Sequence, residues 1–225
     1  MSRHWGSADA SRLRLARVVD QTSVLGPGRR ALVVVQGCHL RCRGCISPGT
    51  HPLDGGEWIE VERLVARLRS IAGIDGVTFS GGEPFLQAAA LARLVDLLRA
   101  EQPRFSAMSY SGYRIEWLRR SGSPTQRSLL DRLDLLVDGP YVRRRHAALR
   151  WRGSRNQRLH LLSARHRAEL EAGADEPAGV ELSLGEDLNL DWVGVPPVPD
   201  FEARIGVELH GNQPAPAAPL AKESR

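Results

Sequence analysis

The chain has 225 residues, 42% hydrophobic and 25% charged, which is the balance of a globular protein with a buried core and excludes a disordered or collagen-like chain. No apolar run approaches the roughly 20 residues of a membrane span, and residues 1–18 lack the apolar stretch of a secretory signal, so we expect a cytoplasmic protein without a membrane partner. The first 160 residues carry 26 basic and 14 acidic side chains and the last 65 carry 5 and 12, so we expect the acidic end to fold back on the basic part or to face a different partner.

The first predicted elements are strands and one helix. Residues 12–19 alternate polar and apolar side chains, which predicts a half-buried strand. Residues 31–35 are wholly apolar and mostly β-branched, which predicts a strand buried on both faces. Residues 58–72 carry apolar side chains at the spacing of an amphipathic helix. Residues 77–79 predict the next strand.

The following segments continue this alternation. Pro84 suits the first turn of a helix, whose buried stripe would run from Leu91 to Leu98. Further elements are expected in this order: a strand at 105–110, short helices at 115–120 and 128–132, and a strand at 133–137. Strands that alternate with helices imply parallel βαβ units, so the predicted fold class is α/β. Ligands of such folds bind at the carboxyl ends of the strands.

The last part of the chain departs from this pattern. Residues 168–179 are acidic and rich in alanine and glycine, which is typical of a surface connection. Residues 180–193 alternate in polarity and predict a small hairpin that turns at residues 185–187. We therefore expect three parts: a main domain at 1–165, an acidic C-terminal extension with a β-hairpin at 166–212, and a disordered tail at 213–225.

The three cysteines of the chain, Cys38, Cys42 and Cys45, lie within eight residues directly after a predicted strand. An odd number of cysteines in such a short segment is a poor disulfide framework and a good metal or cluster loop. A zinc site would need a fourth ligand, for which His39 and His51 are near in the sequence. A [4Fe–4S] cluster normally takes four cysteines, so three would leave one iron open to a substrate or cofactor.

A second motif, Ser80-Gly81-Gly82-Glu83-Pro84, lies between a predicted strand and a predicted helix. Its glycines let the backbone approach a ligand closely, and Glu83 offers a carboxylate to an ammonium group. Alone, this motif would fit an ordinary strand–helix turn. Because both motifs follow predicted strands of one parallel sheet, they favour one shared site.

Together the two motifs resemble the radical S-adenosylmethionine (SAM) superfamily. The resemblance implies a partial (β/α) barrel with a small C-terminal β extension, and it implies that Cys38, Cys42 and Cys45 bind a [4Fe–4S] cluster. It further implies a SAM site formed by Gly44, Ile46, Ser80, Gly81, Gly82 and Glu83. In this superfamily, reduction of the cluster cleaves SAM and releases a 5′-deoxyadenosyl radical. Since the radical abstracts hydrogen directly, no side chain is expected to act as a catalytic acid or base.

Further stretches resemble the activating enzymes of glycyl radical enzymes, and among these the activators of anaerobic ribonucleotide reductase. They are Gly37-Cys38, Gly44, and the blocks at residues 110–113, 136–141 and 152–158, which follow in the expected order within residues 12–165. This resemblance implies hydrogen abstraction from a backbone glycine of a partner enzyme. With no further cysteine in the chain, the electron would come from an external donor such as flavodoxin or ferredoxin.

Two alternatives remain open. Ile46-Ser47 stands where the family commonly has an aromatic residue and an asparagine, and the acidic extension is additional, so a radical SAM enzyme acting on a small molecule or peptide is one alternative. The seven arginines of residues 143–158 would suit a zinc-stabilised module that binds nucleic acid, which belongs to a different class. Few aromatic residues for base stacking lie near them, so we favour a solvated loop or a surface that docks a protein partner.

Overall fold

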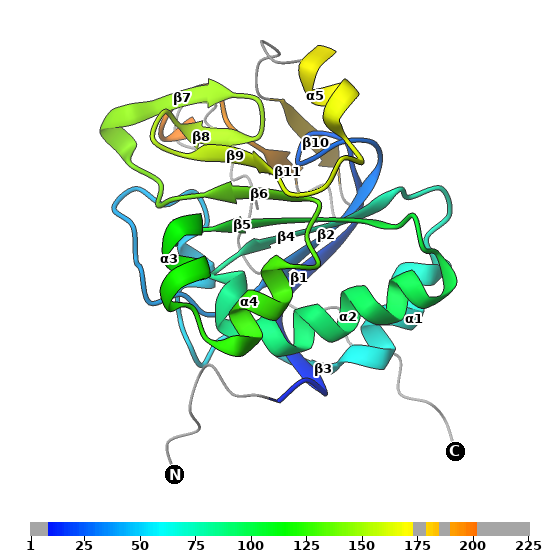
Figure 1. Cartoon of the computed structure of the whole chain (residues 1–225). Helices are drawn as coiled ribbons and strands as arrows, with labels where there is room; N and C mark the ends of the chain where they lie inside the picture. The colour runs from blue at the N-terminus through cyan, green and yellow to red at the C-terminus, as the bar shows by residue number, and fades with distance from the viewer. Residues whose placement is uncertain (1–8, 173–178, 185–189, 202–225) are drawn as a thin grey trace.

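The structure is a computed structural model that describes residues 9–172, 179–184 and 190–201. Its main element is a seven-stranded sheet formed by β1 (Arg12–Thr22), β2 (Arg30–Val35), β3 (Glu57–Glu60), β4 (Gly76–Gly81), β5 (Ser106–Ser111), β6 (Leu135–Asp138) and β9 (Arg158–Leu161). The strand order is β3-β1-β2-β4-β5-β6-β9 (Figure 1). The inner strands β2, β4, β5 and β6 are parallel, and β1, β3 and β9 pair antiparallel beside them. The α/β class with a parallel centre is thus confirmed.

Helices cover one face of this sheet (Figure 1). They are α1 (Val61–Ser70), the 3₁₀ helix η2 (Pro84–Gln87), α2 (Ala88–Glu101), α3 (Ile115–Ser121) and α4 (Pro124–Leu130). Their apolar stripes are buried, as in Leu64 of α1 and Leu94 of α2, which are both 0% exposed. Because side chains alternate along a strand, Val33 and Val35 of β2 pack in the same core as these helices.

The opposite face of the sheet is covered by the later part of the chain. This part contains η3 (Arg143–Arg145), β7 (His146–Leu149), β8 (Arg152–Ser154), α5 (Arg167–Ala172), β10 (Val180–Leu184) and β11 (Leu190–Gly194); another 3₁₀ helix, η1 (Pro48–Thr50), lies earlier in the chain. Leu32 and Val34 pack here against Val193, and Trp151 packs against Leu135. Strand β2 therefore lies between two apolar layers, which explains why all six of its residues are buried.

Three predicted elements differ from those observed. The helix expected at 58–72 begins only at Val61, because residues 57–60 pair as an edge strand with β1, with Ile59 opposite Leu13. The helix expected at 128–132 is α4, which begins after a capping box in which Ser123 and Gln126 bond each other's backbone. The connection expected at 168–179 is partly helical, since α5 ends at Ala172.

The hairpin expected from alternation at 180–193 corresponds to β10 and β11, which pair antiparallel. Its expected turn at 185–187 and the tail expected at 213–225 lie outside the described residues. Strands β7, β8 and β9 were not predicted. Among the helices that the structure describes, none combines the length and the apolar character that a membrane span requires.

Candidate functional site

The cysteine loop begins where β2 ends. Gly37 has a φ of 98°, a left-handed conformation that favours glycine, and it turns the chain out of the strand. The loop closes on itself through two backbone hydrogen bonds, from Gly37 N to Thr50 O (2.8 Å) and from Cys38 N to His51 O (3.1 Å). The loop is therefore anchored to the end of a buried strand at both of its sides.

The three thiols lie around one cavity, which Cys38, Cys42 and Cys45 line. Cys38 is buried and the other two are partly buried. Backbone amides face the sulfur atoms; that of Ser47 donates to Cys45 Sγ at 3.4 Å. Burial raises the pKa of all three thiols, and it raises that of Cys45 to about 11. Thiolates at these positions therefore need a positively charged partner, as a metal centre would be.

The histidines do not join the cysteines around a single point. Within residues 9–172, 179–184 and 190–201, no group of three or more His, Cys, Asp or Glu side chains is placed to share one metal ion. His39 instead bonds to the hydroxyl of Tyr113 at 3.0 Å, and His51 lines the cysteine cavity. A [4Fe–4S] cluster makes a different demand, because each cysteine binds its own iron and the thiols must surround a shared cavity. The arrangement of the three thiols fits such a cluster.

The glycine turn is joined to the cysteine loop through the backbone. Strands β2 and β4 are parallel neighbours with Val35 opposite Gly81, so both segments leave the sheet side by side. Gly82 N donates to Val35 O and Glu83 N donates to Gly37 O, each at 2.9 Å. Gly81 has a φ of 96°, and a Cβ on Gly82 would lie 2.3 Å from Gly37 O. The two glycines thus hold the two loops together, a role that the motif alone did not indicate.

Gly82→Ala is expected to lower the free energy of unfolding by about 2 kcal/mol, because the added methyl group meets a backbone carbonyl that cannot rotate away. Urea unfolding of the purified protein measures this. Gly153→Ala is the matched control: its Cβ would make ordinary contacts, 3.4 Å or more from Tyr141. Equal stability of Gly82→Ala and the wild type would contradict the proposed contact between the loops.

Glu83 places a buried carboxylate in the same cavity. It is 1% exposed, and it accepts hydrogen bonds from Phe85 N (3.0 Å), Ser111 Oγ (3.0 Å) and Gly112 N (2.8 Å). Burial raises the pKa of Glu83 to about 7, although these hydrogen bonds act in the opposite direction. Because all three donors are neutral, a cationic or strongly donating ligand would stabilise the ionised carboxylate further.

The remaining wall of this cavity comes from segments far apart in the sequence. Ser80 and Gly81 end β4, Tyr110 lies at the end of β5, and Tyr141 and Gln157 come from the segments after β6 and before β9. The Tyr110 hydroxyl is buried and has no hydrogen-bond partner among the described residues, so a ligand could satisfy it. None of Tyr110, Tyr141 and Gln157 was predicted to be a site residue, although each lies in one of the family-like blocks.

Gly44 and Ile46 lie apart from the other residues expected to bind SAM. They line a second cavity, whereas Ser80, Gly81, Gly82 and Glu83 line the first, and Cys45 and Tyr141 line both. Gly44 has a φ of 73°, and a Cβ there would lie 2.9 Å from Arg143 Cδ. The cysteine loop therefore separates the expected SAM residues into two groups.

Asp138 connects three elements next to the first cavity. It is 0% exposed; its Oδ2 accepts from Ile115 N, at the start of α3, at 2.8 Å, and Oδ1 accepts from Arg158 Nε of β9 at 3.0 Å. Burial alone would raise the pKa of Asp138, but the hydrogen bonds from Arg158 and Ile115 hold it below its ordinary value of 3.8. Arg158 also bonds both carboxylate oxygens of the exposed Glu116.

Asp138→Asn is expected to lower the free energy of unfolding at pH 7 by about 2 kcal/mol, because it removes a charge-assisted acceptor from a buried position. Since the folded-state pKa of Asp138 is lowered, its stabilising effect is present above pH 3.8 and is lost as the pH falls further. Urea unfolding at pH 7 and pH 3 measures both effects. Glu116→Gln, which removes the exposed partner of the same arginine, should change stability much less than Asp138→Asn does, because solvent screens an exposed ion pair.

The arginine-rich segment is partly used within the chain. Arg143 pairs with Asp200, Arg158 pairs with Asp138 and Glu116, and the Arg150 guanidinium lies 4.5 Å from the Trp151 ring centroid. The ion pairs of Arg143 and Arg158 lower the net positive charge that this segment offers to phosphates, whereas the contact with Trp151 leaves the charge of Arg150 unchanged. The charge of this surface is therefore partly neutralised, which favours a solvated loop or a surface that docks a protein partner over a nucleic-acid-binding site.

The chain is similar to known proteins over this same region. A family model described as a 4Fe-4S single cluster domain matches residues 24–160. The anaerobic ribonucleoside-triphosphate reductase-activating protein of Vibrio cholerae is 33% identical over 144 residues, which cover 61% of this chain and 90% of that protein. That of Enterobacteria phage T4 is 31% identical, covering 64% and 90%. The pyruvate formate-lyase-activating enzyme of Clostridium pasteurianum is 36% identical over 105 residues, 44% of each chain.

Proposed function

The chain belongs to the 4Fe-4S single cluster domain family within the radical SAM superfamily, and on this basis we propose that it is an activating enzyme that generates a glycyl radical on a partner enzyme. A [4Fe–4S] cluster and SAM are the cofactors of such an enzyme. One observation carries the proposal: three cysteine thiols and one buried carboxylate, from the ends of β2 and β4, line a single cavity. The partner would be of the kind that its relatives are named for, such as an anaerobic ribonucleotide reductase.

We assign the cluster to Cys38, Cys42 and Cys45, which lie on one loop with backbone amides facing their sulfur atoms. Gly44 and Ile46 would flank the cluster from the second cavity. The bound cofactors would supply reductive cleavage of the SAM sulfonium and abstraction of a hydrogen atom from the partner's glycine. No side chain of this chain is proposed to act as a catalytic acid or base.

We assign SAM to the segment Ser80–Glu83. The glycine turn brings its backbone close to the cysteine loop, and the Glu83 carboxylate would accept a hydrogen bond from the amino group of SAM. The Tyr110 hydroxyl would gain a partner from the same ligand or from the substrate. These groups would orient the cofactor. The apolar layers on both faces of the sheet would exclude water from the strand ends that carry the site.

Two further parts of the proposal concern architecture and electron supply. We propose that the sheet, with its helices on one face, is a partial (β/α) barrel of the radical SAM type and that residues 1–165 form the catalytic domain. All three cysteines of the chain are in the one loop, so none remains to hold a second cluster. We therefore propose that an external donor, flavodoxin or ferredoxin, supplies the electron.

The test is anaerobic reconstitution with iron and sulfide, followed by reduction with dithionite and addition of SAM. We expect close to four iron and four sulfide per chain and release of 5′-deoxyadenosine and methionine. After incubation with a candidate partner, an anaerobic ribonucleotide reductase, electron paramagnetic resonance should detect a glycyl radical. SAM cleavage without any protein radical would favour a small-molecule or peptide substrate. If the protein binds zinc tightly and takes up no sulfide, both radical SAM functions, activation of a glycyl radical enzyme and reaction with a small molecule or peptide, would be rejected.

A further inference from the structure

Residues 190–201 of the C-terminal extension lie beside the cysteine loop. The family match ends at residue 160, yet Trp192 and Phe201 line the second cavity together with Gly44, Cys45 and Ile46. Tyr141, three prolines and the pair Arg143–Asp200 complete this lining. A segment that the matched family region does not include therefore contributes a wall next to a proposed cluster ligand.

The base of the extension is firmly attached to the sheet. Trp192 is 2% exposed, and Val193 and Val195 pack against Leu32 and Val34 of β2. Arg17 of β1 donates to the backbone oxygen of Trp192 at 3.1 Å. Because these apolar side chains are buried against β2, they hold the start of residues 190–201 in a fixed position on the sheet.

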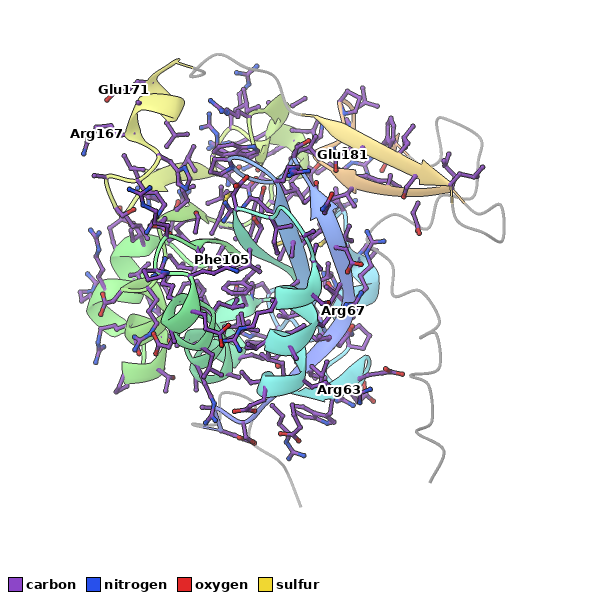
Figure 2. The ribbon with its side chains drawn as sticks, turned by 90° about the vertical axis from the view of Figure 1, so that its right-hand side faces the viewer. Arg63, Arg67, Phe105, Arg167, Glu171 and Glu181 are labelled. Atoms are coloured by element: carbon purple, nitrogen blue, oxygen red, sulfur yellow. The ribbon has the colours of Figure 1, made fainter. Side chains whose placement is uncertain are left out.

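Polar contacts attach the extension at two further points. Glu181 of β10 accepts hydrogen bonds from the backbone N (2.8 Å) and Oγ (2.6 Å) of Ser23, where β10 lies beside the turn after β1 (Figure 2). Arg17 lies 3.7 Å from Asp191. Of these contacts, the one between Arg17 and Asp191 joins a basic residue of the first part to an acidic residue of the end that was expected to fold back on it or to face another partner.

The last described residues of the extension, Asp200 and Phe201, here called the tip, are held by weaker contacts near Cys45. Asp200 forms an exposed ion pair with Arg143, and the Phe201 ring stands edge-on to Trp192 with centroids 5.8 Å apart. The aliphatic part of Arg143 covers Gly44, which has no side chain to obstruct it. The cysteine loop, Arg143 and the tip thus form a continuous series of contacts.

From these contacts we infer that residues 190–201, here called the C-terminal wall, close the Cys45 side of the cluster site and slow the access of solvent and small reagents to the cluster. The inference rests on the proposed function, because it takes the cysteines as cluster ligands. Its physical reason is that the apolar shell around a metal site controls solvent access, and here Trp192 and Phe201 provide that shell. The wall would protect the bound cluster between catalytic cycles.

The main test uses the reconstituted protein and the variant Asp200→Ala/Phe201→Ala, which releases the tip but keeps the buried base. Under anaerobic conditions, a ferrous-iron chelator should remove iron roughly tenfold faster from this variant than from the wild type. Asp200→Asn, which removes only the ion pair, should give a smaller increase. Leu184→Ala, at a side chain that is 66% exposed on the same extension, is the matched control and should leave the rate unchanged.

A second measurement does not need the cluster. In the metal-free protein at one fixed pH, alkylation by iodoacetamide is followed separately for each cysteine by mass spectrometry. The double variant should raise the rate at Cys45 severalfold and leave Cys38, which does not line the second cavity, unchanged. If the double variant and the wild type have equal rates of alkylation at Cys45 and of iron removal, the inference that the C-terminal wall slows access to the cluster is overturned. Failure of the wild type to assemble a cluster would instead overturn the proposed function, and the alkylation rates would still decide on the wall.

Discussion

Cys42→Ala is expected to abolish cluster assembly and, with it, the cleavage of SAM. A cluster bound by three cysteines already has one iron without a protein ligand, so loss of another thiolate leaves half of its irons without one. Cys42 is partly exposed and lies outside the hydrophobic clusters, so the variant should keep the wild-type fold within about 1 kcal/mol. Iron and sulfide content after reconstitution, and 5′-deoxyadenosine after addition of dithionite and SAM, measure the two losses.

Arg43→Ala is the matched control for this variant, because Arg43 is an exposed residue of the same loop. It should take up iron and sulfide as the wild type does. Cys38→Ala is a less direct test, since Cys38 is 8% exposed and its loss would disturb buried contacts as well. Full iron and sulfide content in Cys42→Ala would show that the three cysteines are not the ligand set.

The central strands could be predicted from the sequence because burial on both faces leaves a local signature. Residues 31–35 are wholly apolar, and in the structure they lie between the helical layer and the C-terminal layer. Residues 57–60 show the limit of such reasoning. Trp58 fits the helical spacing that follows it, but pairing of Ile59 with Leu13 of β1 makes this segment a strand. Local periodicity contains no information on such a distant partner.

The part of the site that lies at the ends of β2 and β4 could be predicted from the sequence. The cysteine loop and the glycine turn were expected to meet because both follow predicted parallel strands, and the pairing of Val35 with Gly81 brings them together. The wall beside Cys45 was not predictable in the same way. Arg143 and Asp200 are 57 positions apart and belong to segments with no regular pattern. Their opposite charges predicted only that the acidic end could contact the basic part of the chain, not which residues would pair.

The affinity of the reconstituted protein for SAM is expected to rise with pH from 5.5 to about 7 and then to level off. An ionised carboxylate accepts a hydrogen bond from an amino group more strongly than a neutral carboxyl does. Burial raises the pKa of Glu83 to about 7 from its ordinary value of 4.5, so Glu83 becomes largely protonated below neutral pH. The apparent dissociation constant should therefore increase by up to about tenfold for each unit below pH 7, as measured by equilibrium dialysis.

Glu83→Gln separates this effect from every other titration in the protein. The variant should bind SAM about tenfold to a hundredfold more weakly at pH 8, which corresponds to the loss of a charge-assisted hydrogen bond, and its affinity should not change between pH 5.5 and 7. The metal-free protein provides an independent measure. Because folding raises the pKa of Glu83, this group stabilises the fold below pH 4.5 and loses that effect, at most roughly 3 kcal/mol, as the pH rises through 7. Equal pH dependence of unfolding and of SAM affinity in the wild type and Glu83→Gln would show that Glu83 is not the group that binds SAM.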